Sequence, residues 1–317
     1  MINRELIRIK VVQLVYSYYN SEGKTVEAAQ KEFLFSLDKA YELYQTLLLL
    51  MVSITHIARR AVEVQQSRAQ RLHERADIST KFIENKFIDQ LAHNDQLQSF
   101  QERENSFWPD EEDFLRQTYK RITEQDFYQA YIHKKECTYD DDRELWRHIY
   151  RTILCNNDDL DEILEERSLY WNDDKAIVDT FVLKTIRQFK QENGTQQPLQ
   201  PQFKDDEDPR YAQTLFRVSI ENEDTFRELI REQTRNWDLS RIALMDLVIM
   251  QTALAEIVSF PEIPLSISIN EYVEIAKMYS TPHSGAYVNG MLDTIGKRLI
   301  SEGKVQKLGI NNNYNNK

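Results

Sequence analysis

Apolar residues recur along much of this chain at the spacing of amphipathic helices. In residues 3–19, Ile7, Val11, Leu14 and Tyr18 follow one another at i, i+4, i+7 and i+11, which is the spacing of a buried helical stripe. A polar turn at residues 21–23 ends this pattern. We therefore expect a helix over residues 3–19 with one face in a core.

Two more helices are predicted directly after that turn. Thr25 is a suitable N-cap for a helix through Phe33, because its hydroxyl can accept a hydrogen bond from a free N–H group at a helix start. Asp38 can cap a third helix in the same way. Residues 37–76 contain neither Gly nor Pro, so this third helix is expected to extend to about Arg75.

The middle of the chain keeps a helical pattern with interruptions. Breaks are expected at Trp108-Pro109, at residues 140–142 and at Asn156-Asn157. Residues 192–209 contain three prolines, few apolar residues and four consecutive acids at 205–208. This composition is typical of a linker.

After this linker, five further helices are expected. Apolar residues near 211–218 and 226–230 mark the first two, and Trp237 is expected to anchor the next. The remaining three are predicted over residues 239–258, which Pro261 and Pro264 would end, and over residues 270–279 and 287–300. The last helix carries an apolar stripe of Val288, Leu292, Ile295 and Leu299. The polar tail, residues 301–317, is expected to be disordered.

Composition supports an all-α fold. The 317 residues include only 7 glycines, too few for a protein built from tight hairpins. Two cysteines and a start without a signal-peptide pattern favour a reducing, cytoplasmic setting. The longest apolar run, residues 47–52, is far shorter than the roughly 20 residues that span a bilayer, so a soluble protein without membrane contact is expected.

Charge is distributed unevenly along the chain. The net charge is −12, which by itself disfavours contact with nucleic acid. Residues 36–206, however, hold 23 Lys and Arg against 33 Asp and Glu, whereas the two flanking segments together hold 17 against 19. A small basic face on the nearly neutral flanking segments therefore remains compatible with RNA.

Two sequence blocks near the C-terminus resemble a known family. INEYVEIAK at residues 269–277 precedes YVNGMLD at residues 287–293, and both blocks are similar in composition and separation to the INEAIELAK and FVNGVLD of the NusB family. Near the N-terminus, Arg4 and Arg8 precede Gln13 and Tyr16, which resembles the family's first helix. The similarity covers about residues 3–35 and 208–300.

This resemblance implies an all-helical NusB-like fold interrupted by a large insertion. Residues 1–35 and 210–300 would form the NusB-like domain, residues 36–191 an inserted helical segment and residues 192–209 the linker. NusB proteins pair with the small-subunit ribosomal protein NusE and bind boxA RNA of nascent transcripts. The implied function is therefore RNA-binding transcription antitermination with the transcription elongation complex, without catalysis.

The first candidate RNA contacts lie on the first predicted helix. Arg4 and Arg8 are one turn apart and can face one phosphate track. Lys10 points about 200° away from Arg8 at 100° per residue. The alternative is that these side chains are only solvated, and the resemblance favours RNA contact.

A second group of candidate RNA contacts precedes and begins the last helix. Tyr287 matches the family's aromatic residue beside Val-Asn-Gly and offers a ring on which a base can stack. His283 and Ser284 can add hydrogen bonds. The alternative for Tyr287 is a hydrophobic staple, with Gly290 allowing close helix packing, and both interpretations stay open.

Two residues fall where the family contacts NusE. Asp246 interrupts an apolar helix, so it must be exposed or paired. Tyr16 can contribute a ring whose hydroxyl reaches the surface. A solvated aspartate and a core tyrosine are the respective alternatives.

Within the insertion, charges of both signs cluster. Arg68, Arg71 and Arg75 form a stripe that would extend an RNA path or remain a solvated face. The acidic runs at residues 140–142 and 158–166 would repel RNA and suit a basic protein. An alternative function is therefore a protein-interaction scaffold that binds a basic partner through the acidic insertion.

Signals of cofactor chemistry are missing from the sequence. Neither a G-x-G-x-x-G loop nor a Walker loop occurs, so no nucleotide cofactor is expected. RNA methyltransferases with a NusB-like domain also need a cofactor-binding α/β domain, for which no pattern exists here. His133, Cys137, His148 and Cys155 lack standard zinc-site spacing, so no metal is expected.

Overall fold

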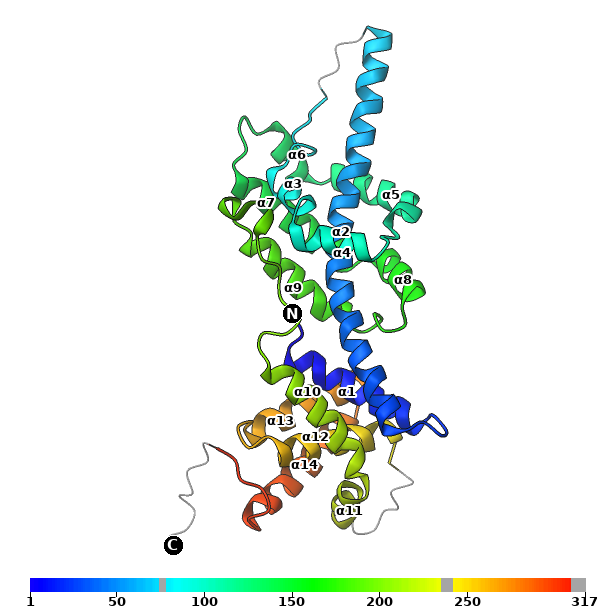
Figure 1. Cartoon of the computed structure of the whole chain (residues 1–317), viewed down its shortest axis with the longest axis vertical. Coiled ribbons are helices and arrows are strands. Elements are labelled where there is room, and N and C mark those ends of the chain that lie inside the picture. Colours follow the sequence, from blue (N-terminus) through cyan, green and yellow to red (C-terminus); the bar gives the residue numbers. More distant parts are fainter. Residues whose placement is uncertain (74–77, 235–241, 309–317) are drawn as a thin grey trace. The chain divides into compact units, whose positions relative to one another are not determined.

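A computed structural model describes residues 1–73, 78–234 and 242–308 of the chain. All regular elements within these ranges are helical, which confirms the all-α class (Figure 1). The structure divides into two compact units. We call residues 2–38 and 203 onward the terminal unit, and Met1 with residues 39–202 the middle unit.

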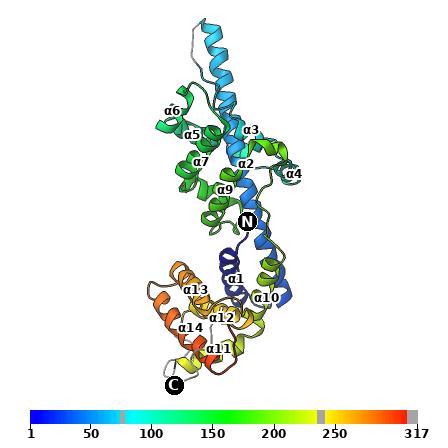
Figure 2. The ribbon, with the colours of Figure 1, turned by 90° about the vertical axis from the view of Figure 1, so that its left-hand side faces the viewer.

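Helices from both ends of the chain build the terminal unit (Figures 1 and 2). Helix α12 lies at its centre, because α1, α10, α11, α13 and α14 all pack against it. Residues 246–257 of α12 are all buried, as expected for a helix that is apolar on nearly every side. The helices of this unit are α1 (Arg4–Tyr19), the start of α2 (Val26–Leu72), α10 (Glu207–Glu221), α11 (Glu223–Gln233), α12 (Leu244–Ser259), α13 (Leu265–Tyr279) and α14 (Ser284–Ser301).

Shorter helices beside the rest of α2 form the middle unit. Two buried tryptophans, Trp108 and Trp146, are among its largest core side chains, and Trp108 Nε1 donates to the Thr46 carbonyl at 2.9 Å. Its α-helices are α3 (Lys86–Ala92), α4 (Asp95–Arg103), α5 (Glu112–Thr123), α6 (Asp126–His133), α7 (Tyr139–Ile149), α8 (Asp158–Arg167) and α9 (Lys175–Gln188). The unit also contains short 3-10 helices, η1 (Trp108–Glu111) and η3 (Gln191–Gln196), and a π-helical segment, η2 (Tyr150–Leu154).

The second and third predicted helices are one helix. α2 runs without interruption from Val26 to Leu72, so the prediction that Asp38 starts a new helix is wrong. Thr25 does cap α2, accepting from the Ala28 N–H at 3.2 Å. Asp38 has suitable chemistry for a cap, but no nearby Gly or Pro stops the preceding helix.

Prolines act differently from the prediction near α13. This helix begins at Leu265, five residues before the predicted start, with Pro264 at its N-cap. Proline is tolerated at the start of a helix, because the backbone N–H group that it lacks would have no acceptor within the helix there. For the same reason Pro209 lies inside the first turn of α10.

The predicted linker is only partly irregular. η3 and the start of α10 occupy its two ends, and Gln197 and Leu199 between them are buried. The acids at 207 and 208 belong to α10, where negative charge at a helix start is favourable. The predicted acid break at 140–142 likewise forms the first turn of α7, behind a Thr138 capping box.

The start of the predicted disordered tail packs against the terminal unit. Val305 is buried, Lys307 Nζ donates to the Phe260 carbonyl at 2.9 Å, and the Leu308 N–H donates to the Pro261 carbonyl at 2.9 Å. Disorder of the tail is therefore wrong for residues 301–308. Residues 309–317, Trp237, Arg75 and the first residues of the helix predicted from 239 lie outside the described ranges.

Across the described ranges, no helix has the length and apolar character that a membrane span requires. The same ranges contain no group of three or more His, Cys, Asp or Glu side chains arranged to hold a metal ion.

Candidate functional site

The candidate site residues all belong to the terminal unit. Helices α1 and α14, which carry most of them, both pack against α12. The fold thus gathers the N-terminal and C-terminal candidates around one central helix. The burial of each side chain decides which of them is available to a ligand.

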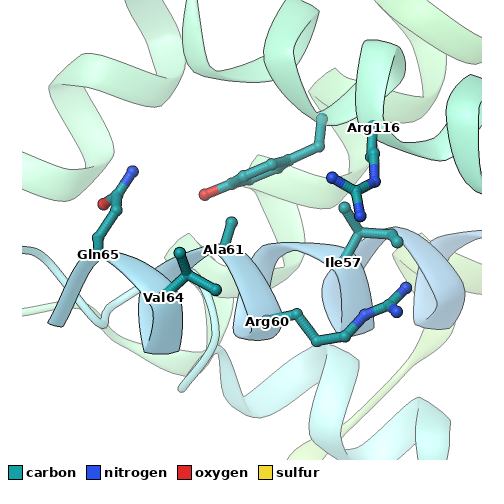
Figure 3. A pocket seen from close by; sticks show the side chains of 7 residues that line it. Ile57, Arg60, Ala61, Val64, Gln65 and Arg116 are labelled. Carbon is teal, nitrogen blue, oxygen red and sulfur yellow. The ribbon is translucent and has the colours of Figure 1, made fainter. Parts of the chain in front are cut away.

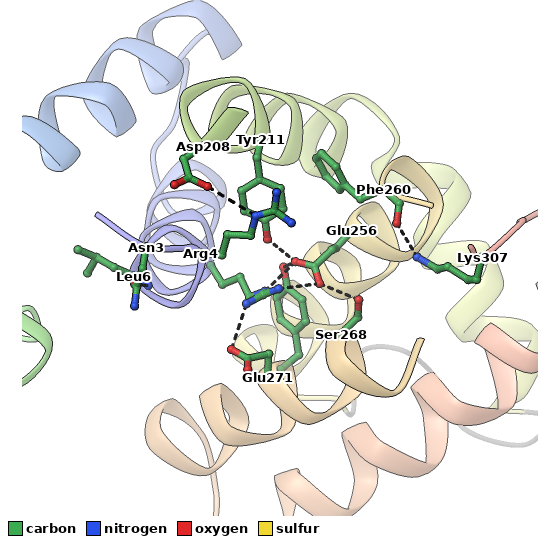
Figure 4. Close-up of polar contacts among 12 residues, drawn as sticks. Asn3, Arg4, Leu6, Asp208, Tyr211, Glu256, Phe260, Ser268, Glu271 and Lys307 are labelled. Atoms are coloured by element: carbon green, nitrogen blue, oxygen red, sulfur yellow. Dashed lines mark hydrogen bonds and ion pairs between the residues drawn. The ribbon is translucent and has the colours of Figure 1, made fainter. Parts of the chain in front are cut away.

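Arg4 lies at the surface at the start of α1. Asn3 caps this helix by accepting from the Leu6 N–H at 2.9 Å. The Arg4 side chain is about one third exposed, lies 3.6 Å from an Asp208 carboxylate oxygen and covers the Tyr211 ring at 4.9 Å (Figure 4). Its guanidinium is held in place on one side and accessible on the other.

Arg8, by contrast, is buried. Its Nε donates to Glu256 Oε2 at 2.7 Å, and its Nη1 donates to Glu271 Oε2 at 3.0 Å. The expectation that Arg8 faces RNA phosphates together with Arg4 is therefore wrong for this structure. Arg8 lies one helical turn after Arg4, at the part of α1 against which α12 and α13 pack.

Glu256 is the centre of this buried polar cluster. The residue is 0% exposed, and it accepts hydrogen bonds from Arg8, the Tyr211 hydroxyl and Ser268 Oγ, the last at 2.7 Å (Figure 4). A buried carboxylate is stable only with such partners. Burial, followed by the nearby charge of Glu256, raises the pKa of Tyr211 well above its usual range, so its hydroxyl remains a donor.

Sequence reasoning missed Glu256, although a signal existed. This glutamate interrupts the apolar pattern of α12 just as Asp246 does at the other end of the helix. A charged residue inside an otherwise apolar helix must be paired. The sequence did not show which of the basic residues pairs with it.

Lys10 is also buried, with an exposed fraction of 2%. The expectation that it contributes an accessible cation is wrong for this structure. Lys10 lies about 200° around α1 from Arg8, so it is on a different side of the helix from the surface that covers Arg8. The side chains of α1 from Leu6 to Val12 are nevertheless all buried, because the helix is covered on several sides.

The group at the start of α14 divides into accessible and buried members. His283, at the N-cap, is exposed and Tyr287 is 38% exposed. Ser284 is buried, and its Oγ donates to Asp246 Oδ2 at 2.9 Å. Ser284 is thus occupied inside the protein, which corrects its assignment as an RNA contact.

Asp246 lies in the first turn of α12 and is 7% exposed. One carboxylate oxygen accepts from Ser284, whereas the other, Oδ1, is buried without a hydrogen-bond partner among the described residues. The bond to Ser284 places Asp246 beside the first turn of α14, which also carries Tyr287. Burial and then the charge of Asp246 raise the pKa of Tyr287. Tyr16, the other candidate partner contact, is half-buried on α1.

Gly290 does not serve helix packing. A Cβ atom at Gly290 would meet nothing within 4 Å, whereas one at Gly296 would lie 2.6 Å from Leu265 Cδ1. Close packing therefore explains Gly296 and not Gly290. Gly290 lies one turn from Tyr287 on an open stretch of α14.

These features define an all-α protein whose two chain ends form one helical bundle around a buried glutamate. The NusB family model matches residues 175–297. The transcription antitermination protein NusB of Salinibacter ruber is 39% identical over 107 residues, which cover 33% of this chain and 67% of that protein. The chain belongs to the NusB family.

A second curated relative agrees with this assignment. The transcription antitermination protein NusB of Desulfatibacillum aliphaticivorans is 40% identical over 93 residues, which cover 29% of this chain and 65% of that protein. A solved structure of T. maritima NusB is 29% identical and covers 39% of this chain and 87% of that chain, with a TM-score of 0.30. The match spans about two thirds of the length of the curated relatives.

Proposed function

We propose that this chain is an RNA-binding transcription antitermination factor that pairs with NusE and binds boxA RNA of nascent ribosomal transcripts. The observation that carries the proposal is the family match over residues 175–297, which includes the helices that present His283 and Tyr287. Relatives that match this region are named transcription antitermination protein NusB. The proposed role involves binding only and no catalytic step.

The proposed RNA surface is smaller than the sequence suggested. Arg4 supplies a guanidinium at the surface, and His283 and Tyr287 supply an exposed imidazole and an exposed ring. A base stacked on Tyr287 would contribute about 1–3 kcal/mol, and Arg4 a salt-sensitive phosphate contact. With Arg8 and Lys10 buried, RNA affinity of the chain alone should be weak and should depend on NusE.

The proposed NusE surface includes Asp246 and Tyr16. A buried carboxylate oxygen without a donor is energetically unfavourable. A partner that displaces the side chains covering Asp246 and supplies an N–H or cationic group would remove this cost. NusE would therefore bind near the start of α12, close to Tyr287. RNA and protein contacts would then adjoin each other, which suits joint recognition of one RNA element.

A mobility-shift assay with boxA RNA tests this proposal, with scrambled RNA as the reference and with NusE present or absent. The complex with NusE should prefer boxA, and Arg4→Glu should weaken it. Arg231→Glu is the matched control, because Arg231 is an exposed arginine on α11 that pairs with the neighbouring Glu228. Equal binding of boxA and scrambled RNA by the mixture would refute the proposal.

One observation favours the alternative scaffold function. Two of the three candidate cations are buried, whereas the six acids of α8 at 158, 159, 161, 162, 165 and 166 are all exposed. An antitermination reporter separates the two functions. Under the scaffold function, Arg4→Glu should preserve activity, and a variant with Asp158→Asn, Asp159→Asn and Glu162→Gln should lose it. Under the RNA-binding function, Arg4→Glu should lose activity and the triple variant should preserve it.

A further inference from the structure

A surface of the middle unit combines exposed apolar side chains with arginines. Two hollows of about 390 and 440 Å³ adjoin each other along α2 and share Ile57 and Arg60 in their walls. Helix α5 contributes Arg116 (Figure 3) and Tyr119 to the first hollow. We call these two hollows together the α2–α5 groove.

The floor of the groove is apolar. Ile57, Ala61 and Val64 line the first hollow and recur at i, i+4 and i+7, so they form one stripe along α2 (Figure 3). Val64 is 65% exposed. From residue 63 to residue 72, α2 is exposed at every position except the half-buried Ala69. This stretch of helix presents a side on which another element can pack.

Arginines surround this floor. Arg59, Arg60 and Arg116 line the two hollows, and the exposed Arg68 and Arg71 follow on α2. The nearby acids are Glu63 and Glu112, and both Arg60 and Arg116 pair with Glu112. Among the described residues, no carboxylate lies within ion-pair distance of Arg59 or Arg68. The groove is therefore a basic region within a segment whose net charge is negative.

The neighbouring histidine responds to this positive charge. Burial and then the charges of Arg59 and Arg60 lower the pKa of His56. A site that disfavours an added cation favours an anion. Carboxylates of a partner would therefore be attracted to the same rim.

We propose that the α2–α5 groove binds an amphipathic helical segment of a partner protein that carries apolar residues on one face and Asp or Glu beside them. The apolar floor suits the face of a helix, and residues 57–72 extend over about 22 Å at 1.5 Å per residue, or four turns. Single-stranded RNA fits less well, because the Tyr119 ring already stacks on Phe82, with 5.8 Å between centroids. This inference is independent of RNA binding by the terminal unit.

A peptide selection on the full-length chain tests the groove. The probe is a displayed library of helical peptides of about 16 residues, with leucines at i, i+3 and i+7 and random residues elsewhere. Selected peptides should be enriched in Asp and Glu, and their binding should weaken as salt is raised. In fluorescence anisotropy, Val64→Glu and Arg59→Glu should each weaken binding by about tenfold or more.

The matched control is Leu169→Glu, because Leu169 is 84% exposed on the same unit and lines neither hollow. This variant should retain wild-type affinity, and thermal melting would establish that all three variants are folded. Failure to enrich any peptide, enrichment of neutral or basic peptides, or binding that Val64→Glu leaves unchanged would each overturn the proposal. Binding of a U-rich RNA that Arg59→Glu weakens and Val64→Glu does not would also overturn it.

Discussion

Arg8 Nε lies 2.7 Å from Glu256 Oε2, across 248 positions of sequence, and both side chains are buried. This pair joins the first helix of the chain to the central helix of the terminal unit. Tyr211 on α10 and Ser268 on α13 donate to the same carboxylate. One glutamate thus connects four helices that come from the two ends of the chain.

Arg8→Ala should strongly destabilise the terminal unit. The substitution leaves Glu256 buried without its cation, and loss of one partner of a buried ion pair costs about 3–5 kcal/mol. Urea unfolding followed by circular dichroism measures the change. Arg231→Ala, which removes an exposed pair, should change the free energy of unfolding by about 0.5 kcal/mol or less. A loss below about 1 kcal/mol for Arg8→Ala would contradict the importance of this pair.

The two glycines of α14 should respond to alanine with opposite signs. Gly296→Ala would place a Cβ atom 2.6 Å from Leu265 Cδ1 in the core. Such overpacking costs about 1–3 kcal/mol, which is only partly offset by the helix-propensity gain of about 0.5–1 kcal/mol that alanine brings. Gly290→Ala would meet nothing within 4 Å and should stabilise the helix by about 0.5–1 kcal/mol. Thermal melting of both variants provides the comparison, and equal effects would refute this account of the two positions.

The sequence predicted the local helices of the terminal unit well. Val288, Leu292, Ile295 and Leu299, which define the predicted stripe of the last helix, are all buried. This prediction succeeds because apolar residues at i, i+4, i+7 and i+11 all lie on one face of a helix, and that face is the one that is buried. Helix ends were less predictable, because Asp38 has the chemistry of a cap and yet lies within α2.

Long-range pairing explains the errors in the candidate site. Arg4 and Arg8 share a helix face by their spacing, but only packing of distant helices decides that Arg4 is accessible and Arg8 is not. Ser284 was wrongly assigned to RNA for a similar reason. Its hydrogen-bond partner, Asp246, lies 38 residues earlier on another helix, so the local sequence did not reveal the pairing. Local patterns predict which face a residue occupies but not which helix covers that face.

Asp246→Asn should weaken NusE pairing and leave the isolated chain nearly unchanged. The orphan oxygen of Asp246 is unfavourable, but its charge is favourable at the start of α12, by about 0.3–1 kcal/mol. These contributions oppose each other in the free chain. In the complex, loss of a buried charge-assisted bond would cost roughly 2–5 kcal/mol. Calorimetric titration with NusE, compared with urea unfolding of the free variant, would separate the effects; unchanged NusE affinity would exclude Asp246 from the interface.

The state of His56 should report the positive charge of the α2–α5 groove. Burial and then Arg59 and Arg60 lower its pKa, so the folded protein favours the neutral ring. The resulting contribution to stability is fully present above the unfolded pKa of about 6.5. It is lost as pH falls through the lower folded value. An NMR titration of the imidazole should show a higher pKa in Arg59→Glu, because this substitution replaces a positive charge that lowers the pKa of His56 with a negative one. An unchanged titration would show that Arg59 does not act on this site.

Tyr287 provides the most direct test of the RNA surface. Tyr287→Ala removes an exposed ring and should reduce the affinity of the chain with NusE for boxA RNA by about 1–3 kcal/mol. Tyr287→Phe should retain most of the affinity, because stacking requires the ring and not the hydroxyl. Met278→Ala, at a 63% exposed position on α13, controls for loss of an exposed apolar side chain.

If the phenylalanine variant binds as weakly as the alanine variant in fluorescence anisotropy, the hydroxyl acts as a hydrogen-bond donor and base stacking on this ring is excluded. If neither variant differs from wild type, Tyr287 lies outside the RNA surface.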